Sequence, residues 1–153
     1  IIKSMQDDKI DKNFVGKKTT SIDKQHCFPV IEGLAEVYKS GTASRLQIPD
    51  INICGKTGTV ENFIKVDGQK KQLKDHSVFL AFAPKEDPKI VIAVFIENGG
   101  FGATIAGPIA SLMIEKYLKG IITRTDLEKR MLEGSLEAEY AKVTSGQPFS
   151  INK

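Results

Sequence analysis

The sequence predicts an α+β fold in which helices cover an antiparallel sheet. Three short segments have the composition and length of strands, and only short connections separate them. Two longer segments repeat apolar residues at spacings of three and four, which is the pattern of amphipathic helices. The chain has 153 residues, 41% hydrophobic and 27% charged, which is enough for one domain with a hydrophobic core.

The first helix is expected after a polar connection over residues 1–27, which has room for one edge strand. Pro29 suits the first turn of a helix, where its missing N–H costs no hydrogen bond. Ser40 and Gly41 end the helical pattern, and we expect Gly41 to close the helix in the left-handed conformation. The apolar stripe of this helix consists of Val30, Ile31, Leu34, Val37 and Tyr38.

Three strands are expected over residues 51–60, 76–83 and 89–97. Between the first two, the turn dipeptide Asp67–Gly68 predicts a hairpin excursion over residues 63–74. Connections this short favour an antiparallel meander. The third strand is apolar at nearly every position, which predicts that it is covered on both faces or lies in the middle of the sheet. One face of the second strand carries Val78, Leu80 and Phe82.

A last long helix is expected to lie flat on the sheet and to stop at Gly120. Residues 121–153 are predicted to form short helices and a tail. Thr125 and Glu128 have the spacing of a capping box, and Ser135 can begin a further helix. The apolar positions of the long helix are Ile105, Ile109, Leu112, Met113 and Tyr117.

Composition and charge argue against several classes of function. The net charge of +3 is not concentrated on one basic face, so we expect no nucleic-acid partner. Cys27 and Cys54 lack metal-ligand spacing, and His26 and His76 stand alone, so we expect no metal and no cofactor. No apolar run approaches the roughly 20 residues that cross a bilayer. No signal peptide is visible either.

The segment over residues 52–59 ends in Lys-Thr-Gly-Thr and is the strongest candidate for chemistry. A lysine, two hydroxyls and a glycine in one extended segment suit the binding of a carboxylate and a developing oxyanion. Gly55–Lys56–Thr57 also ends the phosphate-loop pattern, but that pattern needs a glycine where Asp50 stands and a helix where the sequence is β-like. The structural alternative is a strand that ends in a turn, with Lys56 as an ordinary surface lysine.

Gly55–Lys56–Thr57–Gly58–Thr59 resembles the third signature motif of the penicillin-recognising serine transferases. The likeness to class B penicillin-binding proteins of the elongation type runs from Phe28 to Lys119. It implies that residues 1–153 are the C-terminal part of a transpeptidase domain with the serine β-lactamase-like fold. Residues 28–120 would supply a helix, a three-strand meander and the C-terminal helix. The further matching segments are Ser40–Gly41–Thr42–Ala43, Lys74–Asp75–His76, Phe82–Ala83–Pro84 and Glu97–Asn98–Gly99–Gly100.

Members of this family perform their chemistry with a Ser-x-x-Lys motif and a Ser-x-Asn motif that both precede Lys-Thr-Gly. Here Ser21–Ile22–Asp23–Lys24 has the letters of the first motif, but it lies in a polar segment just before the first helix. We expect Ser-x-Asn to be absent. The chain begins without Met and is expected to be a piece of a longer protein, and the resemblance implies that the nucleophile lies upstream in that protein. The chain alone is therefore expected to be inert.

For the complete enzyme the resemblance implies acyl transfer through a serine ester. The serine would attack a D-alanyl-D-alanine peptide, expel the terminal D-alanine and pass the acyl group to an amine of a neighbouring stem peptide. Lys56 and Thr59 would be catalytic, because Lys56 reaches the Ser-x-Asn serine and the backbone N–H of Thr59 forms half of the oxyanion hole. Thr57, Gly58 and Thr59 would bind the substrate, through two hydroxyls on one side of the strand and room for an added strand.

The implied partners are peptidoglycan stem peptides, β-lactams and other cell-wall elongation proteins. The implied location is the periplasmic side of the inner membrane, with the anchor outside this chain. The 89–97 strand would pair with a strand absent here, so its unpaired edge predicts self-association. The alternatives are a β-lactam sensor or β-lactamase of the same fold, and a non-catalytic interaction domain.

Overall fold

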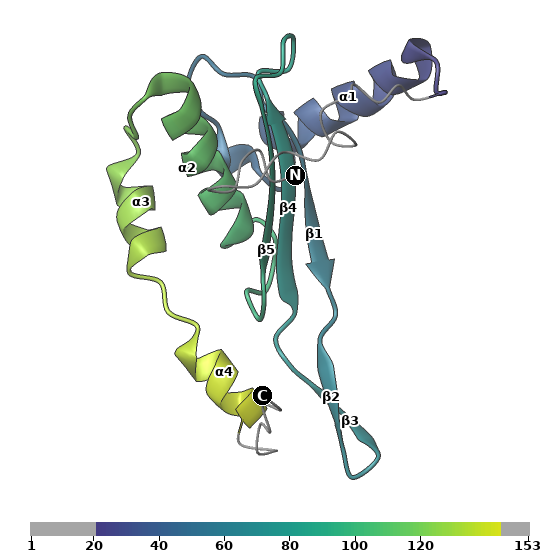
Figure 1. The fold of residues 1–153 in the computed structure, drawn as a ribbon, viewed down its shortest axis with the longest axis vertical. Helices are drawn as coiled ribbons and strands as arrows, with labels where there is room; N and C mark the ends of the chain where they lie inside the picture. The colour runs from purple at the N-terminus through teal and green to yellow at the C-terminus, as the bar shows by residue number, and fades with distance from the viewer. Residues whose placement is uncertain (1–20, 145–153) are drawn as a thin grey trace, which may run out of the picture.

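The computed structural model describes residues 21–144 and confirms the α+β fold. A three-stranded antiparallel sheet carries helix α2 (Ala106–Lys119) across one face, and helix α1 (Lys24–Lys39) packs against strand β1 (Figure 1). Helices α3 (Thr125–Leu132) and α4 (Glu137–Thr144) follow α2. Residues 1–20 of the expected polar connection, with its room for an edge strand, and the tail after α4 lie outside the described residues.

The sheet has the strand order β1–β4–β5, with β1 at Cys54–Val60, β4 at His76–Ala83 and β5 at Ile90–Ile96. Both neighbouring pairs are antiparallel, and each connection leads to the adjacent strand. The predicted meander is therefore confirmed, with all three strands inside their predicted ranges.

The prediction that β5 is central or covered on both faces is wrong. β4 takes the central position, so the outer edge of β5 has no strand partner within residues 21–144. Burial alternates along β5: Ile92 and Val94 are buried, whereas Val91 and Phe95 are 79% and 55% exposed. A run of apolar residues does not reveal which face is covered, because β-branched and aromatic residues are favoured on either face of a strand.

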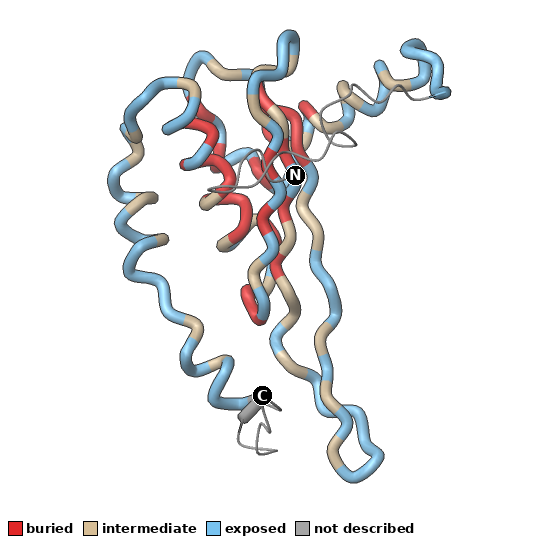
Figure 2. Tube along the Cα trace, in the orientation of Figure 1, coloured by how far each residue is buried: buried red, intermediate tan, exposed pale blue. Residues whose placement is uncertain are grey.

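The core lies between the sheet and α2, as expected (Figure 2). Phe79 of β4 is completely buried there and makes an edge-to-face pair with Tyr38 of α1, with ring centroids 5.9 Å apart. Val78, Leu80 and Phe82 share the opposite face, as predicted, and this is the open face of the sheet, because α2 covers the other one. The buried cluster further includes Ala81, Ile92, Val94, Ala106, Ala110 and Ile114.

Helix α1 begins earlier than predicted. It starts at Lys24, so Pro29 occupies the second turn rather than the first, and the helix already begins inside the expected polar connection. The first turns of α1 project from the body of the protein (Figure 1), where Phe28 and Val30 are exposed. A proline there removes one hydrogen bond from the helix, so Pro29 marks a helical segment but not its first residue.

The expectation for Gly41 is also wrong, since this residue does not have a positive φ. The backbone N–H groups of Ser40 and Gly41 both donate to the carbonyl of Glu36, at 3.1 and 3.0 Å. A Cβ on Gly41 would lie only 2.8 Å from Cα of Val37. The glycine is therefore required by close approach of the chain to the last helical turn, not by a left-handed conformation.

The predicted hairpin excursion is confirmed. Strands β2 (Phe63–Val66) and β3 (Gln69–Gln72) pair in antiparallel fashion. Asp67 and Gly68 between them have φ angles of 50° and 79°, and positive φ at both positions is what a tight type I′ turn requires. The lysines near this turn are exposed, as expected for a solvated hairpin tip: Lys65, Lys70, Lys71 and Lys74.

The C-terminal helices agree with the predictions except at the start of α3. Gly120 ends α2 with a φ of 75°, the left-handed stop that was expected. The capping box is wrong, because Thr125 is the first residue of α3 and Arg124 stands at the N-cap without a side-chain cap. The further helix near Ser135 is confirmed, since Ser135 Oγ accepts a hydrogen bond from the N–H of Glu137 at 3.3 Å.

The described part of the chain offers neither a membrane span nor a metal centre. Within residues 21–144 no helix is long and apolar enough to cross a bilayer. Over the same residues no three His, Cys, Asp or Glu side chains are grouped to hold a metal ion. Cys27 and Cys54 are free thiols, and burial raises the pKa of the Cys54 thiol.

Candidate functional site

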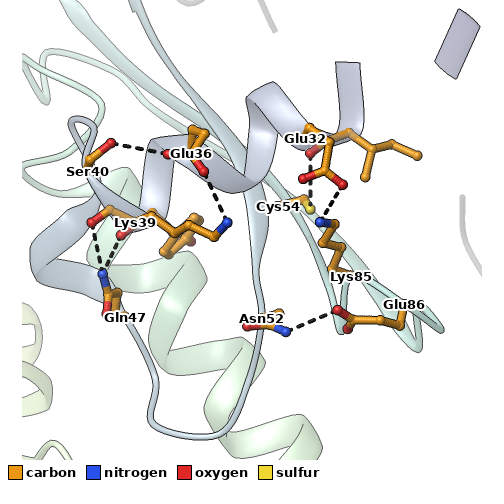
Figure 3. Close-up of polar contacts among 11 residues, drawn as sticks. Glu32, Glu36, Lys39, Ser40, Gln47, Asn52, Cys54, Lys85 and Glu86 are labelled. Carbon is orange, nitrogen blue, oxygen red and sulfur yellow. Dashed lines mark hydrogen bonds and ion pairs between the residues drawn. The ribbon is translucent and has the colours of Figure 1, made fainter. Parts of the chain in front are cut away.

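The Lys-Thr-Gly-Thr segment lies on β1 at the outer edge of the sheet, and polar contacts hold the start of this strand (Figure 3). Lys85 Nζ donates to Glu32 of α1 at 2.6 Å, a hydrogen bond that raises the pKa of Lys85. Asn52, two residues before β1, donates from its amide to Glu86 Oε1 at 3.1 Å. Cys54 Sγ lies 3.7 Å from the carbonyl of Ile31. The start of β1 is thus fixed between α1 and the β4–β5 turn.

The register of β1 against β4 places the motif's side chains on two faces. Thr57 lies opposite the buried Phe79, on the face that α2 covers, and Thr59 shares that face. Lys56 lies opposite Leu80 on the open face. The strand separates the positive charge from the two hydroxyls, as the alternation of side chains along a strand predicts.

Two hydrogen bonds involve the side chains of the motif. Lys56 Nζ donates to the carbonyl oxygen of Thr57 at 2.7 Å. Thr57 Oγ1 lies 3.1 Å from Oγ1 of Thr42, which belongs to the loop between α1 and the short 3₁₀ helix η2 (Ser44–Leu46). The loop around Thr42 matches a family pattern in the sequence, but that pattern assigns this hydroxyl no role. Only the fold brings it to the motif.

The backbone of Gly58 lies beneath the loop that follows β5. A Cβ on Gly102 would clash with the carbonyl oxygen of Val78 and would lie 2.8 Å from the carbonyl oxygen and 3.1 Å from the nitrogen of Gly58. The backbone nitrogen and oxygen of Gly58 and the carbonyl oxygen of Val78 therefore lie together between β1 and β4. This is the arrangement of two opposite residues in an antiparallel pair that exchange backbone hydrogen bonds. Because successive residues of a strand alternate in direction, Thr57 and Thr59 turn their N–H and C=O groups to the outer edge.

Gly102→Ala is expected to destabilise the protein by about 1–3 kcal/mol, because the new methyl group meets rigid backbone of β1 and β4. Urea-induced unfolding measures the effect. Gly33→Ala is the matched control, since a Cβ at Gly33 in α1 meets nothing within 4 Å and should be neutral or slightly stabilising. Equal stability of Gly102→Ala and wild type would show that the loop can move off the sheet at no cost.

Backbone and amide contacts hold this loop in place. The N–H of Asn98 donates to Nδ1 of His76 at 3.1 Å, and the side-chain amide of Asn62 donates to Oδ1 of Asn98 at 2.7 Å. The N–H of Gly100 donates to the carbonyl of Asp75 at 2.7 Å. Asn98 and Gly100 have φ angles of 55° and 76°. These contacts give His76 and Asp75 a structural role in the turn that leads to α2.

A buried ion pair fixes the loop that follows α1. Glu115 of α2 is completely buried and accepts a hydrogen bond from Nε of Arg124 at 2.9 Å. The same guanidinium donates to the carbonyl of Leu46 at 3.2 Å and to that of Ser111 at 3.0 Å. Burial alone raises the pKa of Glu115, but hydrogen bonds from Thr123 and Arg124 outweigh burial and hold that pKa below its usual value. One arginine thereby joins α2, η2 and the start of α3.

The serine motifs require one correction. Ser150–Ile151–Asn152–Lys153 has the letters of both Ser-x-Asn and Ser-x-x-Lys, so the prediction that Ser-x-Asn is absent is wrong. This segment follows Lys-Thr-Gly-Thr, whereas the family pattern places both motifs before it, and it lies outside the described residues. Ser21 is exposed and precedes the helix that begins at Lys24, so these two residues do not share a helical turn.

An antiparallel sheet with a helix across one face and Lys-Thr-Gly-Thr on an outer strand has the fold of the penicillin-recognising serine transferases. Residues 1–115 match the sequence family described as "Penicillin binding protein transpeptidase domain". The chain belongs to this family.

Curated relatives carry matching names. The chain is 38% identical over 73 residues to "Peptidoglycan D,D-transpeptidase MrdA" of Haemophilus influenzae, an alignment that covers 43% of this chain and 11% of the relative. It is 36% identical over 78 residues to "Peptidoglycan D,D-transpeptidase PbpA" of Mycobacterium tuberculosis, covering 48% and 15%. The aligned part thus spans about a seventh or less of the length of these relatives.

Solved structures agree with this assignment. Penicillin-binding protein A of M. tuberculosis, solved as an imipenem acyl-enzyme complex, superimposes with a TM-score of 0.52 at 31% identity, covering 63% of this chain and 20% of that one. Penicillin-binding protein 2 of Pseudomonas aeruginosa superimposes with a TM-score of 0.51 at 27% identity, covering 67% and 22%.

Proposed function

We propose that this chain is the C-terminal part of the transpeptidase domain of a peptidoglycan D,D-transpeptidase. The complete protein cross-links stem peptides through a serine acyl-enzyme, and penicillins acylate the same serine. The observation that carries the proposal is Lys-Thr-Gly-Thr on an outer strand, whose outer edge pairs with no strand within residues 21–144 and can receive a peptide. The names of the relatives and the imipenem acyl-enzyme of a structural neighbour support it.

Lys56 has the catalytic role on the open face of the sheet. Its ammonium group rests on the carbonyl of Thr57, in a position from which it can turn to a serine placed over this face. A charge-assisted hydrogen bond to that serine is worth roughly 1.5–3 kcal/mol. Leu80, Val91 and Phe95 form an exposed apolar surface on the same face, which suits a covering layer that holds the serine motifs.

The outer edge of β1 binds the substrate. The N–H and C=O groups of Thr57 and Thr59 point to this edge, so an extended peptide can add to β1 as a further strand. Gly58 lets the peptide backbone approach closely. The N–H of Thr59 supplies half of the oxyanion hole, and the hydroxyls of Thr57 and Thr59 bind the terminal carboxylate of the substrate or the carboxylate of a β-lactam.

The remaining assignments follow from the family. Residues 28–120 form the wall of the active site, and α3 packs against α2 beyond it. The complete protein works on the periplasmic side of the inner membrane, together with other cell-wall elongation proteins. The outer edge of β5 pairs either with an upstream strand of the same protein or with a second copy, because an unpaired apolar edge invites association.

The experiment that tests the function is intact-mass spectrometry of the full-length protein after exposure to benzylpenicillin, beside this chain alone. One adduct is expected on the full-length protein and none on the chain. If the full-length protein forms no adduct, the proposed activity is wrong, and the protein is a binding domain of the same fold. An adduct on this chain would mean that it contains the nucleophile, and Ser150 would be the first residue to replace.

A further inference from the structure

The hydroxyl pair of Thr42 and Thr57 has a feature that the proposed function does not use. Each hydroxyl has one proton to donate and can accept hydrogen bonds from others. At 3.1 Å one of the two must donate to the other. If Thr57 donates, its proton is not available to an anion. If Thr42 donates, the proton of Thr57 is free to point away from Thr42.

The loop that carries Thr42 is held at both ends. Ala43 is completely buried, and its N–H donates to the carbonyl of Val37 at 3.0 Å. The carbonyl of Leu46, at the end of η2, accepts a hydrogen bond from Arg124 at 3.2 Å. Thr42 therefore has an exposed side chain on a backbone that is already fixed. Holding its hydroxyl in one orientation costs little further entropy, because only the rotation of the side chain is lost.

We infer that Thr42 is a positioning residue for acylation: its hydroxyl donates to Oγ1 of Thr57 and directs the Thr57 proton to the ligand carboxylate. The inference rests on the proposed function, because it takes Thr57 to bind that carboxylate. In a chain of hydrogen bonds each donor polarises the next, so the bond from Thr57 to the anion is strengthened. No proton is transferred between these hydroxyl groups. Thr42 acts only on the direction in which the Thr57 hydroxyl points its proton.

The test compares Thr42→Val and Thr42→Ser in the full-length protein by the second-order rate constant of acylation by benzylpenicillin. Thr42→Val keeps the shape and removes the donor, and we expect a loss of roughly three- to tenfold. Thr42→Ser keeps the donor and should stay close to the wild-type rate. Thr57→Val should lower the acylation rate constant more than Thr42→Val does. The double variant Thr42→Val with Thr57→Val should react at the same rate as Thr57→Val alone. A purely structural Thr42 would instead reduce the rate in both backgrounds.

A second ligand separates the positioning role from a general loss of fit. With a penicillin whose carboxylate is esterified, wild type and Thr42→Val should react at equal rates, because the anion is missing. Thr125→Val is the matched control, since Thr125 is exposed at the start of α3. Equal rates of Thr42→Val and wild type with benzylpenicillin, or an equal loss with the ester, would overturn the inference alone. A wild-type protein without any adduct would overturn the proposed function, and the inference with it.

Discussion

Lys56→Ala in the full-length protein is expected to slow acylation by benzylpenicillin about 10- to 150-fold, the rate that corresponds to the loss of one charge-assisted hydrogen bond of roughly 1.5–3 kcal/mol. The lysine side chain is exposed on the open face of the sheet, and its only hydrogen bond within residues 21–144 goes to the carbonyl of Thr57. Its removal should therefore leave the fold unchanged. Stopped-flow or quenched acylation kinetics, with thermal unfolding of the same samples, measure both quantities.

Lys71→Ala is the control for Lys56→Ala, because it removes the same charge from the exposed strand β3. That variant should keep the wild-type acylation rate, which excludes a general effect of net charge on the anionic ligand. If Lys56→Ala reacts within about threefold of wild type, Lys56 is the surface lysine of the structural alternative. If Lys56→Ala lowers the unfolding temperature as well as the rate, a folding defect explains the loss.

Arg124→Met is expected to destabilise the protein by about 3–5 kcal/mol, the cost of leaving one partner of a buried pair without the other. Glu115 would remain buried without its cation, and the carbonyls of Leu46 and Ser111 would lose a donor each. Urea-induced unfolding of wild type and variant measures the difference. Arg130→Met, at an exposed position of α3, is the control and should change stability little.

A double replacement tests the explanation. Arg124→Met with Glu115→Met should recover most of the lost stability, because a well-packed apolar pair can replace a buried ion pair. If Arg124→Met costs no more than Arg130→Met, the ion pair contributes nothing to folding. If the double variant is no more stable than Arg124→Met alone, the cost lies in the lost donors to the two carbonyls rather than in the unpaired carboxylate.

The same pair predicts a dependence on pH. The pKa of Glu115 is lower in the folded protein than its ordinary value of 4.5, so the unfolded chain binds more protons between the two values. The stabilisation is therefore complete above about pH 4.5 and is lost as the pH falls through the folded pKa. The difference in unfolding free energy between wild type and Glu115→Gln should be largest at neutral pH and should shrink in acid. If the difference in unfolding free energy between wild type and Glu115→Gln stays constant as the pH falls below 4.5, this prediction is wrong.

The parts of the fold that the sequence predicted correctly are those with local signals. Asp67–Gly68 sets a turn because two positive φ angles are easy there, and Gly120 ends a helix for the same reason. The first residue of α1 and the N-cap of α3 were predicted wrongly, because Pro29 and Thr125 fit several nearby helix positions equally well. The covered face of β5 was missed because it depends on where α2 packs, not on the composition of β5.

In the candidate site, too, the local features could be predicted from the sequence and the long-range contacts could not. The order of Lys56, Thr57 and Thr59 along one strand already fixed their alternation between two faces, and the register agrees. The contact of Thr57 with Thr42 joins positions 15 apart, and that of Arg124 with Leu46 joins positions 78 apart. Periodicity relates only residues within one or two turns of each other, so it cannot find such pairs.

The two outer strands of the sheet have opposite compositions, and this difference has a consequence for how the protein tolerates change. β1 carries lysine, threonine and glycine, and polar and charged residues along an outer strand protect it from pairing with other chains. β5 is isoleucine, valine, alanine and phenylalanine throughout, a composition suited to a contact that forms once and is kept. Exchanges among apolar residues should therefore be tolerated along β5, whereas replacing the lysine or threonines of β1 by apolar residues should make that strand prone to aggregation.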